Sequence, residues 1–191
     1  MCSWCWGYKP TWRQVQQHLS NTITVEYIVG GLAPDSNAPM PEALALTIQS
    51  HWKRIESELG TQFNYDFWTK CSPKRSTYPA CRAVLAAKNQ HKEKTMIQRI
   101  QEAYYLQAMN PSEPSTLIQL ACEIGLDESQ FKQDISSPEI EQDLQNQINL
   151  ARGPLVRGFP SLVLVKEGNT YPIPVDYHNP TTTIEAISNH L

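Results

Sequence analysis

The chain has 191 residues, of which 40% are hydrophobic and 18% charged, and its formal net charge is −3. This composition fits a folded globular protein with one large domain or two small ones. The weak negative charge argues against nucleic acid or an anionic membrane as a partner. The sequence shows neither an apolar run of roughly 20 residues nor a secretion signal. Its five cysteines, an odd number, indicate free thiols, so we expect a cytoplasmic protein.

Two cysteines, Cys2 and Cys5, stand at the start of a predicted helix. The unpaired N–H groups and the positive dipole end of a helix stabilise a thiolate. A cysteine three positions further on lies one turn away, where it can attack a mixed disulfide formed by the first. We therefore interpret Cys2 as the nucleophile and Cys5 as the resolving thiol of a redox pair. The alternatives are thiols in a frayed terminus or half of a zinc site, for which the sequence offers no second ligand pair.

The first third of the chain is predicted to form a helix, a strand and a further helix. Pro10 is expected to start or kink the first helix, whose apolar face carries Trp12, Val15 and Leu19. Residues 23–29 are rich in β-branched side chains and predict a buried strand that ends at Gly30 and Gly31. Three apolar stripes at helical spacing then follow, carried by Leu44, Ile48, Trp52, Ile55 and Leu59, by Met96, Ile97, Ile100 and Tyr104, and by Leu117, Leu120, Ala121 and Ile124.

Local signals place the ends of several later elements. Gly125 is typical of a helix stop, and Asp127 and Ser137 are typical of helix starts. Residues 61–78 predict a loop with aromatic anchors at Phe63, Tyr65, Phe67 and Trp68. The apolar run 161–165 predicts a strand, a turn follows at 168–169, and residues 170–175 predict a second strand. Two prolines confine that second strand to a sheet edge or make it irregular, and residues 183–191 predict a short final helix.

Strand and helix units at both ends with helices between them predict an α/β fold interrupted by a helical insertion. We place the α/β domain in residues 1–38 and 154–191 and the inserted helical domain in residues 39–153.

Five segments distributed over nearly the whole chain carry a family resemblance. They are CSWCWG at 2–7, VGGLAP at 29–34, HWKR at 51–54, YPACRAVLAA at 78–87 and RGFPSLVLV at 157–165. With them the chain resembles the DsbA-like thiol oxidoreductases of the thioredoxin superfamily, and in particular the FrnE-like branch. The resemblance implies a thioredoxin-like fold with a helical insertion and thiol–disulfide chemistry on protein substrates. It implies no cofactor beyond the Cys2–Cys5 disulfide, with glutathione as a candidate redox partner, and no metal.

The resemblance also implies features on either side of the cysteine pair. Members of this fold have a strand directly before the pair, where this sequence has only Met1. We therefore expect that first strand to be missing from this chain, through a truncated or misplaced start, or to be supplied by another segment or a partner. A truncated start would allow a periplasmic location. After the insertion, Pro160 is expected to form a cis peptide bond facing the cysteines.

Several other side chains are candidates for the site or for its surroundings. The Phe159 backbone, next to Pro160, would pair with a substrate peptide. Trp4 could be a half-exposed platform for an apolar substrate or part of the core, and Trp6 is expected to be packed. The positive charges Lys9 and Arg82 are candidates for lowering the pKa of Cys2. His51 is expected to be an ordinary surface histidine.

For the remaining cysteines, a structural role is expected in preference to a functional one. Cys81 and Cys122 are expected to be buried and inert, because they stand among apolar helical residues. Cys71 lies in the predicted loop, and a second disulfide between Cys71 and Cys81 is a weaker alternative.

Two other functions remain open. Glutathione-dependent transferases of the kappa type and hydroxychromene-carboxylate isomerases share the inserted helical domain, but they place a serine where Cys2 stands. A non-enzymatic polypeptide-binding module, with its thiols idle, is the third interpretation.

Overall fold

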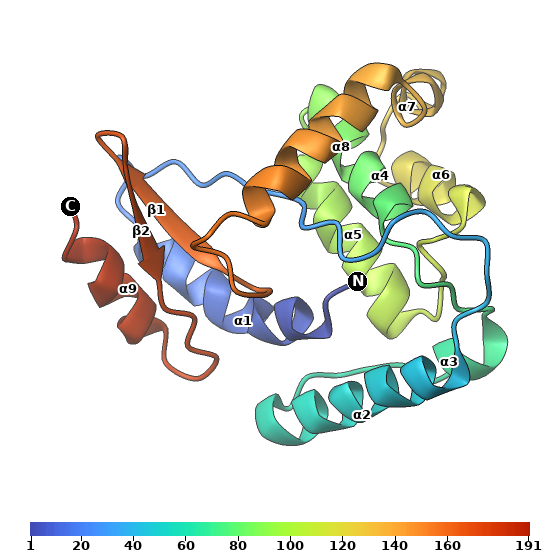
Figure 1. Ribbon diagram of the computed structural model, residues 1–191, viewed down its shortest axis with the longest axis horizontal. Coiled ribbons are helices and arrows are strands. Elements are labelled where there is room, and N and C mark those ends of the chain that lie inside the picture. Colours follow the sequence, from blue (N-terminus) through green and yellow to red (C-terminus); the bar gives the residue numbers. More distant parts are fainter.

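The chain folds into nine helices and one two-stranded sheet, in a computed structural model that describes residues 1–191 (Figure 1). The elements are α1 (Ser3–His18), α2 (Glu42–Leu59), α3 (Phe67–Lys70), α4 (Tyr78–Asn89), α5 (Glu93–Leu106), α6 (Pro114–Glu123), α7 (Glu128–Asp134), α8 (Pro138–Ala151), β1 (Leu162–Lys166), β2 (Asn169–Ile173) and α9 (Pro180–Ser188). None of the helices has both the length and the apolar character needed to cross a bilayer.

Helix α1 begins at the cysteine pair, as predicted, and continues through Pro10. Pro10 therefore lies inside the helix and does not start it. The buried face of α1 packs against α9 and the hairpin, where Val15, Ile173 and Ile187 form a small core. This core joins the first helix to the last quarter of the chain, and α1 leads from the amino terminus near the middle of the molecule toward the hairpin and α9 (Figure 1).

The sheet is an antiparallel hairpin of β1 and β2, as predicted. Lys166 pairs with Asn169, and the two residues between them, Glu167 and Gly168, both have positive φ (50° and 80°). Such a turn matches the twist of the two strands. Pro172 lies within β2, which is an edge strand, so its missing N–H leaves no interior hydrogen bond unmade.

The predicted strand at residues 23–29 is wrong in one respect. The backbone of this segment is extended, and its side chains alternate between half-buried and exposed, but it pairs with no other strand. Val29 instead donates its N–H to the side-chain oxygen of Gln147 in α8, at 2.9 Å. A strand requires a hydrogen-bonded neighbour as well as a suitable composition. The residues dictate an extended backbone, but they do not provide the neighbour.

Helix α4 is the centre of the helical part and contacts α5, α6, α7 and α8. Its buried face is rich in alanine, which lets neighbouring helices approach closely. The predicted helix ends are confirmed here: Asp127 accepts the N–H of Gln130 at 2.7 Å, Ser137 accepts that of Ile140 at 3.2 Å, and Gly125 has φ +72°.

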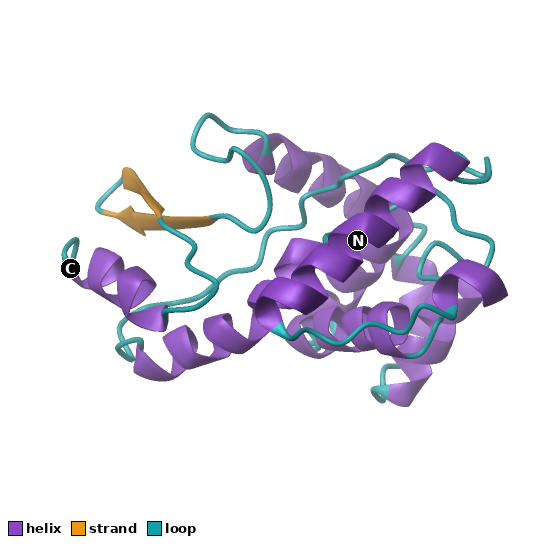
Figure 2. Cartoon of the chain, turned by 90° about the horizontal axis from the view of Figure 1, so that it is seen from below, coloured by secondary structure: helices purple, strands orange, loops and turns teal.

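An aromatic cluster fixes α2 to the start of α1. Trp52 is fully buried at its centre, and six rings lie around it with centroids 4.9–6.1 Å away: Phe63, Tyr65, Phe67, Trp68, Tyr104 and Tyr105. The Trp52 indole N–H donates to the Ser3 hydroxyl at 3.0 Å. The aromatic anchors of the predicted loop are thus confirmed, although the loop also contains the short helix α3. In Figure 2, which looks at the molecule from below, the long helix α2 crosses in front of the amino terminus.

The hairpin, α1 and α9 occupy one end of the molecule, and α4 to α8 occupy the other (Figure 1). The division of the chain at residues 38 and 154 stays a prediction.

We expect Trp52→Ala to destabilise the protein by about 3–5 kcal/mol, because it leaves a large cavity and removes the hydrogen bond to Ser3. Urea unfolding followed by circular dichroism measures the change. The control is Leu150→Ala, since Leu150 is 62% exposed, and its effect should stay within about 0.5 kcal/mol. Equal effects of the two substitutions would contradict the central role of Trp52.

Candidate functional site

Cys2 is the N-cap of α1. Its backbone is extended (φ −96°, ψ 112°), and its sulfur accepts the N–H of Cys5 at 3.4 Å. The side chain of an N-cap residue faces the unpaired N–H groups of the first turn, which carry the positive end of the helix dipole. A negative charge on the Cys2 sulfur is therefore placed where the helix stabilises it best.

The two thiols differ in acidity. The neighbouring Cys5 side chain and the backbone N–H groups of the first turn favour the Cys2 thiolate over the desolvation that opposes it, and the pKa of Cys2 falls to about 7. The pKa of Cys5 is instead raised well above its ordinary value, because the Cys2 sulfur beside it and its own burial disfavour a second negative charge. At neutral pH a large fraction of Cys2 is thus present as the reactive thiolate, while Cys5 keeps its proton.

The late Phe–Pro bend lies directly beside this thiolate. The Cys2 thiol is 3.4 Å from the Phe159 carbonyl oxygen and donates to it when protonated, although 157 positions separate the two residues. The Phe159–Pro160 peptide bond is cis, the isomer that the family resemblance implies. Both residues are half-buried, so they form part of an accessible surface next to the sulfur. The structure therefore brings Cys2, Cys5, Phe159 and Pro160 together.

Trp4 and Trp6, on either side of Cys5, have different surroundings. Trp4 is half-buried, with Tyr177 packed edge-on at 5.3 Å and the Arg54 guanidinium 5.3 Å from its ring. Trp6 stacks on the buried ring of Tyr105 at 5.4 Å and donates its indole N–H to the backbone. The packed position expected for Trp6 and the partial exposure expected for Trp4 are both observed.

Two glycines form the wall opposite Phe159, and the sequence patterns suggested only that they end a strand. A Cβ atom on Gly30 would lie 2.5 Å from the Phe159 ring. A Cβ atom on Gly31, which has φ +51°, would lie 2.5 Å from Ile148. The paired glycines therefore allow the extended segment to pass close to the Phe–Pro bend. Two consecutive glycines after an apolar run were the available signal for this close approach.

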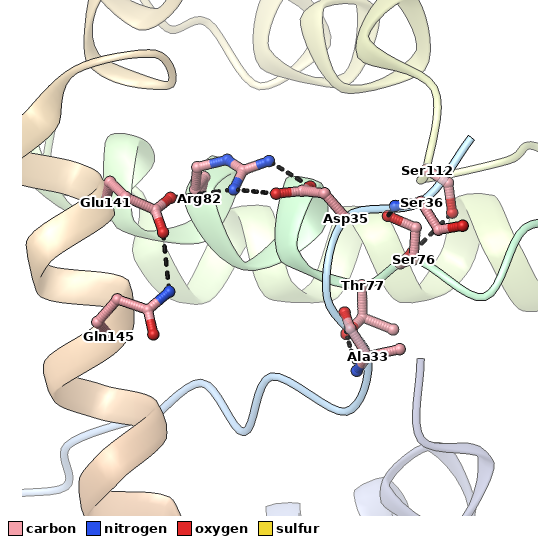
Figure 3. A network of polar contacts seen from close by, with 9 residues as sticks. All are labelled: Ala33, Asp35, Ser36, Ser76, Thr77, Arg82, Ser112, Glu141 and Gln145. Carbon is pink, nitrogen blue, oxygen red and sulfur yellow. Dashed lines mark hydrogen bonds and ion pairs between the residues drawn. The ribbon is translucent and has the colours of Figure 1, made fainter. Parts of the chain in front are cut away.

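A polar network holds the chain that follows these glycines (Figure 3). Arg82 binds Asp35 through two hydrogen bonds of 2.6 and 2.9 Å and Glu141 through one of 3.1 Å. Thr77 accepts the N–H of Ala33 at 3.0 Å and donates to its carbonyl at 3.1 Å. The segment between the two ends of the fold is thus fastened to α4 and α8, which in turn fixes the wall of the site.

The two cations proposed to activate Cys2 lie elsewhere. Arg82 is occupied by its two carboxylates and acts on the neighbouring thiol of Cys81. The Lys9 ammonium lies over the Trp6 ring, 4.8 Å from its centroid. Neither is a cause of the lowered pKa of Cys2. The Cys5 thiol and the N–H groups of the first turn supply the stabilisation that the sequence analysis assigned in part to these side chains.

The other three cysteines are free thiols. The Cys71 thiol donates to the Ala108 carbonyl at 2.9 Å, and no disulfide joins Cys71 to Cys81. The core position predicted for Cys122 is wrong, because Cys122 is exposed and lies 3.5 Å from Glu128, on the outer face of α6. His51 is exposed, as expected. No three side chains among His, Cys, Asp and Glu gather in a way that could hold a metal ion.

A cysteine pair at a helix start, a facing cis-proline and a hairpin packed on the same helix define the class of thioredoxin-like proteins. A family model described as thioredoxin matches residues 1–183. The chain therefore belongs to the thioredoxin family.

Two curated relatives match in sequence. The ClpXP adapter protein SpxH of Halalkalibacterium halodurans is 26% identical over 147 residues, which are 72% of this chain and 46% of the relative. The protein of the same name from Bacillus subtilis is 23% identical over 154 residues, or 79% and 50% of the two chains. The chain thus spans about half the length of the curated relatives it matches.

Solved structures agree with the fold over the whole chain. A candidate protein disulfide isomerase from Nitrosomonas europaea superposes with a TM-score of 0.86 at 27% identity, covering 99% of this chain and 92% of its own. The cytosolic disulfide reductase DsbM from Pseudomonas aeruginosa gives 0.81 at 22% identity and covers 100% and 94%. The thioredoxin-like fold with additional helices is confirmed, and the FrnE-like branch stays a prediction.

We expect the Cys2 thiolate to form as the pH rises through about 7, two units below the ordinary thiol value of 9.0. The ultraviolet absorbance of the thiolate and the rate of alkylation should both follow this transition, because the thiolate is the nucleophile. Cys2→Ser should abolish the transition and Cys122→Ser should leave it. A reduced protein whose first thiolate appears only near pH 9 would contradict the stabilisation by the helix start.

We expect Gly30→Ala to displace Phe159 and to slow thiol–disulfide exchange by about tenfold, because the new methyl group would overlap the ring. The matched control is Gly158→Ala, where the added Cβ meets nothing within 4 Å. Exchange with a peptide disulfide, measured on both variants beside their unfolding midpoints, separates displacement of the ring from global destabilisation. Unchanged exchange in a folded Gly30→Ala protein would show that the position of Phe159 is unimportant.

Proposed function

We propose that this protein is a thiol–disulfide oxidoreductase that acts on protein disulfides or dithiols through a mixed disulfide with Cys2. The observation that carries the proposal is the position of the Cys2 sulfur, which caps α1 and lies 3.4 Å from the Phe159 carbonyl. One wall of the site thus favours the thiolate, and the other presents backbone beside it.

In the reducing direction, the Cys2 thiolate attacks one sulfur of a substrate disulfide. A bond forms between Cys2 and that sulfur, and the second substrate sulfur leaves as a thiolate, which takes up a proton. Cys5 then loses its proton and attacks the Cys2 sulfur. This step forms the Cys2–Cys5 disulfide and releases the first substrate sulfur as a thiolate. Two electrons pass from the protein to the substrate, and the oxidising direction is the same sequence reversed.

The unequal pKa values suit the two cysteines to these roles. A large fraction of Cys2 is ionised at neutral pH and can react, whereas Cys5 keeps its proton. The first attack removes the negative charge from the Cys2 sulfur, and with it one of the causes that raise the pKa of Cys5. Resolution therefore becomes easier only after the mixed disulfide has formed.

Phe159, Pro160 and Trp4 are the proposed contacts for the substrate. The backbone at Phe159 is placed to pair with an extended peptide, since its carbonyl already faces the reacting sulfur. The half-buried Trp4 ring offers an apolar surface next to Cys5. Protein substrates are favoured, because the half-buried Phe159 offers its backbone to an extended chain beside the Cys2 sulfur.

The solved relatives support this chemistry. The Nitrosomonas europaea protein is described as a candidate disulfide isomerase, and DsbM as a cytosolic disulfide reductase that was also solved with glutathione. We therefore propose the Cys2–Cys5 pair as the only redox group, glutathione as a candidate partner that resets it, and a cytoplasmic location for the reaction. Cys2 stands where the glutathione-dependent transferases have serine, so that alternative is not favoured.

A second candidate function follows from the curated relatives, both of which are described as ClpXP adapter proteins. An adapter needs a surface for a polypeptide and no thiol chemistry. This function corresponds to the polypeptide-binding module considered from the sequence, and loss of the thiols should leave it intact.

We expect Cys2→Ser to abolish disulfide exchange with a scrambled or insulin-like substrate, because it removes the nucleophile. Cys5→Ser should instead accumulate a covalent mixed disulfide, because the resolving thiol is absent. Non-reducing electrophoresis and mass spectrometry detect this species, and Cys122→Ser is the matched control for an exposed thiol. Full activity of the Cys2→Ser protein would refute the oxidoreductase and leave the binding module.

A further inference from the structure

A pocket of about 340 Å³ shares Phe159 with the candidate site, and the proposed reaction leaves it unused. It lies between the glycine segment and the loop that connects α8 to β1, and its lining includes Gly30, Gly31, Leu32, Arg152, Arg157 and Phe159. Phe159 connects the pocket to the site, because its carbonyl faces the Cys2 sulfur at 3.4 Å. A substrate that binds against Phe159 while it reacts with Cys2 would therefore lie next to a residue of the pocket lining.

Two unpaired positive charges stand in the pocket. Arg152 and Arg157 are exposed and take part in none of the ion pairs of the structure. No acidic residue lines the pocket. The C-terminal end of α8 lies nearby, and its dipole corresponds to about half a negative charge. The positive charge of the two guanidinium groups is larger than this. The pocket is therefore positive.

The rest of the lining suits a peptide-like group. The two glycines lack side chains, so the backbone of their segment can be approached closely. Leu32 is 46% exposed and offers an apolar surface beside that backbone. A planar guanidinium group binds a carboxylate through two parallel hydrogen bonds, whereas a lysine ammonium group acts only as a point charge. The pocket thus offers a backbone that a ligand can approach closely, an apolar side chain, and guanidinium groups that can bind a carboxylate.

We propose that this pocket is a substrate subsite that binds a carboxylate carried next to the reacting sulfur. This inference rests on the proposed oxidoreductase function and names its preferred substrate class. The carboxylate can belong to an Asp or Glu side chain that flanks a cysteine in a polypeptide, or to a small thiol such as glutathione.

The test compares peptide disulfides that differ only in the residues flanking the cysteine, which are Glu, Gln or Lys. The intact protein should react fastest with the Glu peptide. Arg152→Gln combined with Arg157→Gln should reduce kcat/KM for that peptide by about tenfold, since each exposed pair contributes about a few-fold. The rate with the Gln peptide should stay the same. Arg157→Glu should shift the preference toward the Lys peptide. The control is Arg75→Gln, because Arg75 is an exposed arginine outside the pocket.

Two further measurements keep the failure of the subsite distinct from the failure of the chemistry. Alkylation of Cys2 by neutral iodoacetamide should be equally fast in all arginine variants, because their effect is on binding. Peptides with serine in place of cysteine should show the same order of affinity by calorimetry, without any redox step. Equal affinities and rates for the Glu, Gln and Lys peptides, together with unchanged exchange with glutathione disulfide in the double variant, would overturn the subsite while the exchange activity persists. Loss of exchange in the unmodified protein would overturn the function itself.

The same variants identify the source of the carboxylate. If the double substitution slows exchange with glutathione disulfide but not with the Glu peptide, the subsite is built for the small thiol. The reverse result assigns it to acidic polypeptides.

Discussion

The site depends on one local interaction, the capping of α1 by the side chain of Cys2. The same sulfur accepts an N–H from the first turn and faces the Phe159 carbonyl from the far end of the chain. Capping orients the sulfur, and the Cys5 thiol together with the N–H groups of the first turn lowers its pKa. Stability at the start of a helix and reactivity of a thiol are thus two results of one arrangement.

The rest of the fold holds the partner of this interaction in place. The small core of Val15, Ile173 and Ile187 brings the hairpin and α9 to α1. From the other side, the hydrogen bond between Trp52 and Ser3 fastens the first turn of α1 to α2. The Arg82 network fixes the chain that follows the two glycines (Figure 3). Each element around the sulfur is therefore attached to a different part of the molecule.

Features that depend on neighbouring residues in the sequence could be predicted, and those that depend on distant partners could not. The caps at Asp127 and Ser137 and the role of Cys2 at the start of α1 follow from a few adjacent residues. The segment 23–29 has the composition of a strand, but pairing depends on a neighbour that it does not find. The exposure of Cys122 depends on which side of α6 faces solvent. The contact of Cys2 with Phe159 was expected only through the family resemblance, because no local pattern links positions so far apart.

The separation of 157 positions between Cys2 and Phe159 also sets an order of events during synthesis. The cysteine pair leaves the ribosome first, and the helical insertion must follow before the opposite wall exists. Until then the thiols stand at the start of a nascent helix, without the surface that selects their reaction partner. Synthesis of the segment that contains Phe159 is therefore the step that turns two ordinary sulfhydryls into a site.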